Sequence, residues 1–393
     1  MGKGRRCWLE IDLGAIEDNV AAIRQNLKPE TAFLAIVKGD AYTHGAKVVA
    51  KTLDALPGVD FFGVACYDEA ADLRAGGAKK PILILGDTDA ELAQEMEAGD
   101  MVQCCWSIRY AKKLDAEMAG TGKKLKVHMK IDSGLSRLGI VNHEEEDFAP
   151  SLEEARQMLR LKNLDFEGIF THFAKAEDED PSFTDYQYAN FMKMVTAIEA
   201  AGHKFKYIHC DNSAGAAFHP DKQCNMIRSG TSLYGYTPNL KRPIPGVRRA
   251  IQWRAVISQL KWLRPGSVIS YGCTYEVKTP ARIATVCVGY ADGLFRELSN
   301  NFEVLVNGRR AKGVGRICMD QMMIDVTGIE GVEEGDVVTL FGDDHGAHLD
   351  AQELADLLGK SQINMISYIT KRVPRVYFRD GKEVGETNYL RMV

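Results

Sequence analysis

The sequence predicts an α/β protein in which an N-terminal (β/α)8 barrel of the TIM type precedes a mostly β C-terminal domain. From Phe33 to Tyr236, short β-branched runs alternate with longer amphipathic stretches, a pattern typical of βα units around a parallel sheet. After Pro238-Asn239 the pattern changes to strands of alternating polarity. The chain has 393 residues, which exceeds the size at which one hydrophobic core normally stops growing, so two domains are expected.

Eight strands are expected in the barrel. In chain order they are the runs FLAIV (33–37), FFGVA (61–65), PILIL (81–85), MVQCCW (101–106), LKVHMKI (125–131), FEGIFTHF (166–173), YIHCD (207–211) and NMIRSG (225–230). Helical patterns separate these runs, and several end at the glycine that commonly follows a helix C-terminus. Eight such units close a TIM barrel.

The stretch PNLKRPIPGVRR, residues 238–249, is rich in Pro and Arg and indicates a domain boundary. We expect a barrel over residues 13–240 and a β domain over residues 241–393. Strands of the β domain are expected at IQWRAVISQLKWL, RIATVCVGY, EVLVNGRRAKGVGR and DVVTLFG, with Asn307-Gly308 as a hairpin turn. The run WLEIDL has the same strand character, so a strand over residues 7–12 is expected to join this domain and make it discontinuous.

Composition excludes several classes of partner. The net charge is −5 and no long run of Lys or Arg occurs, so the electrostatic footprint of a nucleic-acid binder is missing. No apolar run approaches the ~20 residues needed to span a bilayer, and the basic N-terminus has no apolar signal core, so a cytoplasmic protein is expected. The nine cysteines contain no C-x-x-C pair, which favours reduced thiols over a disulfide framework or a zinc site. No metal is expected.

Polar residues stand at the ends of several predicted barrel strands, where active sites gather on this fold. In chain order these are Lys38, Lys130, His172, Asn212-Ser213 and Arg228. A lysine that ends an apolar strand is partly desolvated, which suits it to forming a Schiff base. Taken singly, each residue also has an ordinary structural explanation: a lysine that reaches solvent, a packed histidine, or a salt bridge at the barrel rim.

Taken together, these residues fall in motifs that resemble those of the alanine racemase family. The run AIVKGDAYTHGA, residues 35–46, resembles the family's cofactor-lysine motif. Further matches, in the family's order, are HMKIDSGLSRLG, GIFTHFAKAEDED, HCDNSAG, MIRSGTSLYG, SYGCTYE, VGYADG, GRICMDQ and RVPRVY. The resemblance implies a pyridoxal-phosphate-dependent isomerase that interconverts L- and D-alanine.

Two bases on opposite faces of the substrate α-carbon follow from the resemblance. Lys38 would hold pyridoxal phosphate as an aldimine and act as the base on one face. Tyr271, in SYG, would be the opposite base and would reach the site from the second domain of the partner subunit in a homodimer. Racemisation requires both, because a proton removed from one face and returned to the other inverts the centre.

The cofactor ligands are also implied by the resemblance. Arg228, in MIRSG, matches the residue that donates a hydrogen bond to the pyridine nitrogen, which favours racemisation over transamination. His172 would support the ring and Arg228. The other implied cofactor ligands are Tyr42, Asn212, Ser213, Gly230 and Thr231, which include the phosphate contacts.

Arg137, in LSRLG, matches a residue beside the cofactor phenolic oxygen and the substrate carboxylate. Lys130, on the preceding strand, matches a lysine that is carbamylated in many relatives, and a carbamate here is a hypothesis that a mass shift would test. The second domain of the partner would supply further substrate contacts, namely Met319 and Asp320 in CMDQ, while Tyr290 and Arg296 match residues of the access channel.

Lys371 departs from the family pattern. Relatives commonly have a tyrosine immediately before the RVPR segment, where it contacts the phosphate and narrows the substrate pocket. Lys371 resembles the situation in serine racemases of the family, so serine, or a broader set of amino acids, is an alternative substrate; Lys371 is also a candidate phosphate ligand. Tyr368, three residues earlier, is a candidate to compensate, although helical geometry would usually point it elsewhere. The segment Gly39-Asp40 also departs from the family pattern, which more often has Ala followed by Asn or Asp, and Thr43 stands where the family more often has Gly.

Two other classes of protein remain as alternatives. A non-catalytic pyridoxal phosphate carrier would bind the cofactor without changing optical rotation, but the pair of Lys38 and Tyr271 argues against it. An amino-acid decarboxylase of similar domain order would carry a triple-glycine phosphate loop, and no such run occurs in the sequence. The resemblance favours a cytoplasmic, homodimeric racemase that makes D-amino acids.

Overall fold

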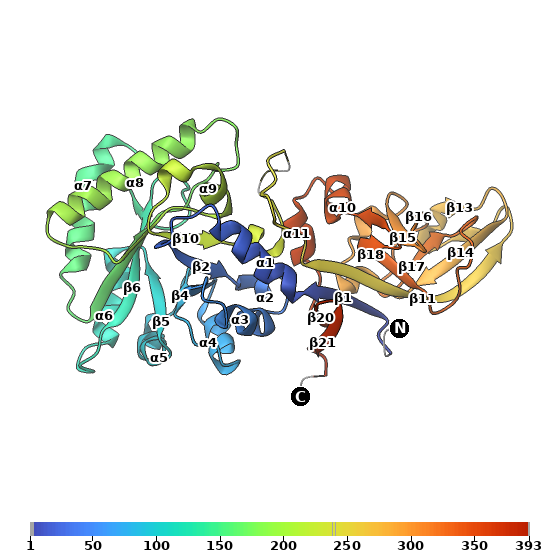
Figure 1. The fold of residues 1–393 in the computed structure, drawn as a ribbon, viewed down its shortest axis with the longest axis horizontal. Coiled ribbons are helices and arrows are strands. Elements are labelled where there is room, and N and C mark those ends of the chain that lie inside the picture. The colour runs from blue at the N-terminus through green and yellow to red at the C-terminus, as the bar shows by residue number, and fades with distance from the viewer. Residues whose placement is uncertain (1–3, 238, 240, 392–393) are drawn as a thin grey trace. The chain divides into compact units, whose positions relative to one another are not determined.

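The computed structural model describes residues 4–237, 239 and 241–391 (Figure 1). The chain forms two compact units. The barrel unit contains Ala15–Ala41 and Ala46–Arg249, and the β unit contains Met1–Gly14, Tyr42–Gly45 and Ala250–Val393. Residue 240, the expected last residue of the barrel, and residues 1–3 of the basic N-terminus lie outside the described residues.

The barrel unit is built on eight parallel strands. In spatial order they are β10 (Met226–Ser229), β2 (Ala32–Ile36), β3 (Phe61–Val64), β4 (Ile82–Ile84), β5 (Met101–Cys105), β6 (Leu125–Asp132), β8 (Leu164–Phe170) and β9 (Tyr207–His209). Each strand overlaps one of the eight apolar runs, and most of their residues are buried, as expected for parallel strands covered on both faces. The short β7 (Ile140–Val141) pairs with the end of β6.

The barrel is nearly closed. β9 and β10 form the two ends of the strand order. Across the seam between them, the backbone N–H of Arg228 donates to the carbonyl oxygen of Asp211 at 3.0 Å. The predicted α/β class, with a (β/α)8 barrel followed by a mostly β domain, is confirmed.

Helices lie around the outside of the parallel strands (Figure 1). They are α1 (Leu13–Arg24), α3 (Ala46–Asp54), α4 (Tyr67–Ala75), α5 (Ala93–Ala98), α6 (Ile108–Glu117), α7 (Glu145–Leu159), α8 (Ser182–Ala200) and α9 (Ser213–Phe218), with short 3-10 turns η1 (Ala90–Leu92), η2 (Pro220–Lys222) and η3 (Thr231–Tyr234). Their ends follow local sequence signals: the Ser107 hydroxyl accepts the Tyr110 N–H at 3.2 Å and so caps α6. Within the described part of the chain, every helix is too short or too polar to cross a membrane.

The β unit is a ten-stranded sheet. Its spatial order is β19 (Ala347–Leu349), β18 (Val337–Asp344), β15 (Glu303–Val306), β16 (Arg309–Gly313), β17 (Met322–Asp325), β14 (Ala281–Val286), β11 (Ile251–Leu263), β1 (Cys7–Asp12), β20 (Arg375–Arg379) and β21 (Lys382–Thr387). β1 is antiparallel to β11 and parallel to β20. A strand from the start of the chain therefore lies inside a sheet made by its C-terminal third.

Shorter elements complete the β unit. They are the strand pair β12 (Val268–Ile269) and β13 (Tyr275–Glu276), the helices α10 (Ala351–Leu357) and α11 (Gln362–Ser367), and the turns η4 (Tyr271–Cys273), η5 (Tyr290–Asp292) and η6 (Arg296–Leu298). Asn307 and Gly308 join β15 to β16 with φ of 49° and 73°. Two positive φ values define a type I′ turn, which accounts for the Asn-Gly sequence at this hairpin.

Candidate active site

Lys38 is presented by an unusual turn at the end of β2. The turn labelled α2 (Lys38–Tyr42) is left-handed: φ is 62° at Gly39, 56° at Asp40 and 53° at Ala41. The Ala41 N–H donates to the Val37 carbonyl oxygen at 2.9 Å. Left-handed backbone costs roughly 1–2 kcal/mol for each L-residue other than glycine, so neighbouring groups must hold this turn in place.

Two carboxylates stabilise the turn. Glu69 accepts the Gly39 N–H at 2.6 Å through one oxygen and the Ala65 N–H at 2.7 Å through the other. Asp40 accepts the Ala46 N–H at 2.9 Å. Gly39 departs from the family pattern, yet both Gly39 and Asp40 suit the turn, because glycine and aspartate tolerate left-handed backbone better than most residues.

The surroundings of Lys38 favour a neutral amine. Burial lowers the pKa of the Lys38 amine, the positive charge of Arg137 lowers it further, and the Glu69 carboxylate opposes both. A neutral amine is the form that attacks a carbonyl carbon, so this lysine has the property that Schiff-base chemistry requires.

Arg228, on β10, is buried inside the barrel and bonded on both amino groups. Nη1 donates to Nδ1 of His209 at 2.9 Å. Nη2 donates to Nδ1 of His172 at 3.0 Å and to the carbonyl oxygens of Thr171 and Cys210 at 2.8 and 3.1 Å. Burial lowers the pKa of Arg228 to about 10, which still leaves the guanidinium charged at neutral pH. The side chain is therefore a fixed cationic donor.

A chain of histidines continues from Arg228 across the barrel. Nε2 of His209 lies 2.9 Å from Nδ1 of His128, and Nε2 of His128 lies 3.7 Å from the Glu167 carboxylate. An arginine can only donate, so Nδ1 of His209 accepts and its proton sits on Nε2; the same reasoning puts the proton of His128 on Nε2. Burial lowers the pKa of both histidines, with the charge of Arg228 contributing, so both are neutral. Sequence reasoning missed this chain.

Lys130 and His172 lie in the same buried region. Burial, followed by the charge of Arg228, holds the pKa of the Lys130 amine and of His172 well below their usual values. The Lys130 Nζ stands 4.5 Å from the centre of the Phe170 ring. A lowered pKa favours the neutral amine, which is the nucleophilic form of lysine.

Arg137 leaves the barrel on a tight turn after β6. The Asp132 carboxylate accepts the N–H groups of Gly134, Leu135 and Ser136 at 3.1, 3.0 and 3.0 Å. Burial tends to raise the pKa of Asp132, but the N–H donors outweigh it and the net shift is downward. The Arg137 side chain is exposed, so it is free to meet a ligand.

The candidate phosphate ligands gather at the ends of β9 and β10. Asn212 caps α9 by accepting the Gly215 N–H at 2.9 Å. The Ser213 hydroxyl accepts the Gly230 N–H at 2.9 Å and the Ser232 N–H at 3.4 Å, beside Thr231 at the start of η3. The Ser232 hydroxyl is buried and has no hydrogen-bond partner among the described residues. The backbone N–H groups together with the hydroxyls of Ser213 and Ser232, the latter unsatisfied, fit a phosphate.

Tyr42 belongs to the short segment that groups with the β unit. Burial raises the pKa of its phenol to about 12, so Tyr42 is protonated at neutral pH and can donate a hydrogen bond. The next residue, Thr43, has φ of 75°. Its hydroxyl donates to the Ile366 carbonyl oxygen at 3.2 Å, which compensates part of the strain of a β-branched residue in left-handed backbone.

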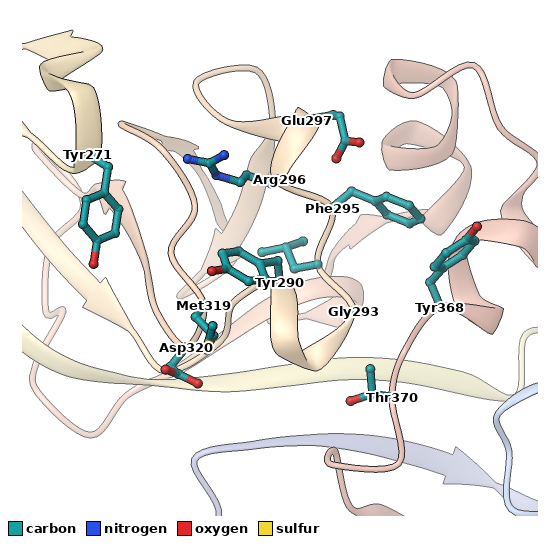
Figure 2. Close-up of a pocket in the computed structure, with 11 residues that line it drawn as sticks. Tyr271, Tyr290, Gly293, Phe295, Arg296, Glu297, Met319, Asp320, Tyr368 and Thr370 are labelled. Carbon is teal, nitrogen blue, oxygen red and sulfur yellow. The ribbon is translucent and has the colours of Figure 1, made fainter.

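A second cluster of predicted residues lines a pocket of about 910 Å³ in the β unit (Figure 2). Its lining includes Tyr271, Tyr290, Arg296, Met319 and Asp320, all of which the sequence motifs singled out. Figure 2 shows Tyr271, Tyr290 and Asp320 toward one end of the pocket and Phe295 with Tyr368 at the other.

Backbone pairing brings Tyr290 next to Met319. The Tyr290 N–H donates to the Cys318 carbonyl oxygen at 3.0 Å, and the Ala291 N–H donates to the Met319 carbonyl oxygen at 3.0 Å. A Cβ at Gly289 would lie 2.4 Å from both carbonyl oxygens, so only glycine fits at this crossing.

Arg372, in the RVPR motif, holds this end of the pocket together. Its guanidinium lies 2.5 Å from Asp320 and 3.2 Å from the buried Asp292. Asp292 also pairs with Arg6 and accepts the Gly289 N–H at 3.0 Å. Sequence reasoning missed Arg372 as an organiser of the pocket.

Tyr271 projects from a strained turn and is 66% exposed. Residues Ser270, Gly272 and Cys273 have φ of 65°, 73° and 49°. The Ser270 hydroxyl donates to the Arg316 carbonyl oxygen at 2.5 Å, and a Cβ at Gly272 would approach the Arg316 guanidinium to 2.9 Å. The turn is thus held against a cation from the neighbouring loop.

Lys371 and Tyr368, close together in the sequence, have different surroundings. Lys371 is exposed, and its Nζ lies 5.2 Å from the centre of the Tyr389 ring, which also faces Arg375 at 5.4 Å. Tyr368 lines the pocket of the β unit and packs on Phe295 with ring centres 4.7 Å apart. α11 ends at Ser367, so helical spacing no longer directs the Tyr368 side chain.

Comparison with known proteins identifies the family of the chain. The family model for the alanine racemase N-terminal domain matches residues 11–238, and the model for the alanine racemase C-terminal domain matches residues 250–377. The chain belongs to the alanine racemase family. The resemblance inferred from the motifs is confirmed. Tyr389, the neighbour of Lys371, lies beyond the matched part of the C-terminal domain.

Relatives in the alanine racemase family cover nearly the whole chain. Alanine racemase 1 of Caldanaerobacter subterraneus subsp. tengcongensis is 38% identical over 385 residues, which is 98% of this chain and 97% of the relative. Alanine racemase of Methanococcus maripaludis is 37% identical over 372 residues, 94% of this chain and 98% of the relative. Alanine racemase of Clostridium difficile 630 has a TM-score of 0.92 at 34% identity, covering 98% of this chain and 99% of that chain. Alanine racemase from Bacillus anthracis, solved with bound L-Ala-P, has a TM-score of 0.89 at 35% identity, covering 100% of both.

Proposed function

We propose that this chain is an amino-acid racemase that uses pyridoxal phosphate to interconvert L- and D-alanine. The observation that carries the proposal is the Lys38 amine, whose pKa is lowered at the end of a barrel strand. The full-length likeness to alanine racemases supports the same activity. Pyridoxal phosphate, when bound, supplies the electron sink that makes the substrate α-proton acidic.

We propose the barrel, over residues 13–240, as the cofactor-binding domain and residues 241–393 with strand 7–12 as the second domain. Lys38 would hold the cofactor aldehyde. Ser213, Asn212 and the N–H groups at Gly230 and Thr231 would hold its phosphate, together with Tyr42, and the unsatisfied Ser232 hydroxyl supports this placement.

Arg228 would donate a hydrogen bond to the pyridine nitrogen. Its bonds to His209, His172 and two carbonyl oxygens hold the guanidinium in one orientation. Because the guanidinium stays charged at neutral pH, a nitrogen that faces it remains an acceptor. We assign His172 to positioning Arg228.

Lys38 and Tyr271 would move the proton on opposite faces of the substrate α-carbon. The lowered pKa of the Lys38 amine favours its neutral form, which can accept a proton. Tyr271 lies on an open pocket with Tyr290, Met319 and Asp320, and its high exposure in a single chain supports completion of the site by a second copy. We therefore propose a homodimer in which each pocket serves the partner's barrel.

Lys130 would act as a carbamate. Its lowered pKa favours the neutral amine, which can add carbon dioxide and release a proton to become an anion able to orient Arg137. Intact mass spectrometry at neutral pH, with and without added bicarbonate, tests this. A mass increase of one carbon dioxide that maps to Lys130 is expected, and a free amine under both conditions contradicts it.

Alanine is the proposed substrate, since the relatives and structures described above are alanine racemases. Serine stays the second candidate, because Lys371 stands where relatives commonly have a tyrosine that narrows the substrate pocket. The Lys371 amine faces the Tyr389 ring instead. We also propose Lys371 as a phosphate ligand. A cytoplasmic location stays a prediction, which cell fractionation tests.

Chiral chromatography of the purified protein with pyridoxal phosphate tests the function, using L-alanine and L-serine separately. Racemisation of alanine is expected, and Lys38→Ala is expected to lose both the activity and the visible absorbance of the lysine-bound cofactor. Bound cofactor without racemisation would indicate a carrier. In a Lys371→Tyr variant, selective loss of activity on serine would assign substrate choice to this position.

A further inference from the structure

Two cysteine thiols lie side by side at the seam of the barrel. Cys210 follows β9 and Cys224 precedes β10, and their sulfur atoms are 3.6 Å apart. Cys210 is fully buried, whereas Cys224 is half-buried. A small molecule that enters this region therefore meets Cys224 first.

One backbone carbonyl holds both thiols in place. The Cys210 thiol donates to the Lys222 carbonyl oxygen at 3.4 Å, and the Cys224 thiol lies 3.8 Å from the same oxygen. Lys222 is itself anchored, because its amine pairs with Asp185 and Asp221 at 2.7 Å each. The proximity of the thiols is thus built into the loop.

The pair spans the one place where the strand order of the barrel ends. The seam between β9 and β10 is bridged by the Arg228 N–H, which donates to Asp211, and by Nη2 of Arg228, which donates to the Cys210 carbonyl oxygen. A disulfide bond is about 2.0 Å long, so the sulfur atoms would approach each other by about 1.6 Å. Rotation of two short side chains and a small movement of the loop can supply that approach.

We propose that Cys210 and Cys224 form a redox modification site, which a small-molecule disulfide oxidises to an intrachain disulfide across the β9–β10 seam. The reduced pair is the form found in the structure.

The reaction balances as a thiol–disulfide exchange. The Cys224 thiolate attacks one sulfur of the small disulfide, and the other sulfur leaves as a thiolate. The Cys210 thiol then loses its proton to solvent and attacks the Cys224 sulfur, expelling the second small thiolate. Both expelled thiolates take up protons, so two protein thiols are oxidised and one small disulfide is reduced to two thiols.

A disulfide across the seam would affect the proposed phosphate ligands on the loop. The loop 211–223 carries Asn212 and Ser213, so the disulfide would fix both ends of the segment that holds them. We expect slower release of pyridoxal phosphate from the oxidised protein. This consequence, unlike the disulfide itself, rests on the proposed function.

Peptide mapping of the intact protein tests the site. The purified protein is incubated with oxidised glutathione, free thiols are blocked with iodoacetamide, and an unreduced digest is analysed by mass spectrometry. We expect a peptide pair linked through Cys210 and Cys224, with two of the nine thiols lost and recovered on adding dithiothreitol. Cys224→Ser should abolish the linked pair. The matched variant Cys66→Ser, which changes another half-buried cysteine of the barrel, should retain it.

Recovery of Cys224 as a free thiol, or only as a stable mixed disulfide with glutathione, would overturn the proposal even if the variants fail to fold. A second readout is thermal unfolding: oxidation should raise the Tm of the wild-type protein by several degrees and leave that of Cys224→Ser unchanged. If the linked pair forms while cofactor release is unchanged, the redox site stands and the phosphate assignment of Asn212 and Ser213 fails.

Discussion

Neutral histidines buried beside Arg228 make the stability of the barrel depend on pH. Burial lowers the pKa of His128, His172 and His209, and the charge of Arg228 adds to the shift. In the unfolded chain each would titrate near 6.5. These are bases whose folded pKa is depressed, so below pH 6.5 the unfolded state binds more protons than the folded state. The stability is fully present above that pH and is lost as the pH falls toward the folded pKa values.

The magnitude follows from counting protons between about pH 6 and pH 5. The three histidines can take up at most three protons on unfolding. Asp211 acts in the opposite sense, because its folded pKa is raised to about 7 and it releases a proton on unfolding. A net uptake of at most two protons changes the free energy of unfolding by up to about 2.7 kcal/mol per pH unit. Lys130, whose pKa is also lowered, adds to the uptake wherever it is neutral in the folded state.

Comparing a histidine variant with the wild type isolates the contribution of one histidine to the slope of unfolding free energy against pH. His209→Asn should reduce the slope by about 1.4 kcal/mol per pH unit, the contribution of one proton. The assay is urea unfolding followed by far-ultraviolet circular dichroism at several pH values between about 7 and 5. His345→Asn, at an exposed position, is the control and should leave the slope unchanged. Equal slopes for wild type and His209→Asn would refute the reasoning.

Three further predictions concern the β unit. Tyr271→Phe should abolish racemisation while exchange of the α-proton in deuterated water persists for one enantiomer only; equal small losses for both enantiomers would remove the two-base assignment. Gly289→Ala places a Cβ 2.4 Å from two carbonyl oxygens and should destabilise the β unit by about 1–3 kcal/mol in urea unfolding, and an unchanged midpoint would contradict that contact. Asn307→Ala, at φ of 49°, should cost about 1 kcal/mol in the same assay, whereas Asn307→Gly should not.

Much of the fold can be predicted from the sequence, because its strands and turns have local sequence signals. All eight apolar runs of the barrel became strands, and the run IQWRAVISQLKWL coincides with β11 from Ile251 to Leu263. Asn307-Gly308 forms the expected hairpin turn because a type I′ geometry has a narrow choice of residues. Strand-end lysines and arginines could also be located, since the end of an apolar run is itself a sequence feature.

The missing parts of the site depend on contacts between residues far apart in the chain. His128, His209 and Arg228 lie on three different strands, and nothing in the neighbouring sequence of each indicates that they bond in series. The left-handed turn after Lys38 was missed because Gly39 and Asp40 merely tolerate positive φ and Ala41 gives no signal for it. One signal was available: His128 stands two residues before Lys130 on β6, so alternation places both side chains on the same face of the strand.

The position of β1 in the sheet means that it stays without its partner strands during much of synthesis. β1 pairs with β11 and β20, so its partners are made only after the entire barrel has left the ribosome. At ordinary translation rates, the interval between residue 12 and residue 251 is on the order of 10–50 s, and β20 appears later still. Throughout that interval the nascent chain displays an apolar strand with two unpaired edges, the kind of surface that templates aggregation. Yield of this enzyme should therefore respond to chaperone supply and growth temperature more than its final stability suggests.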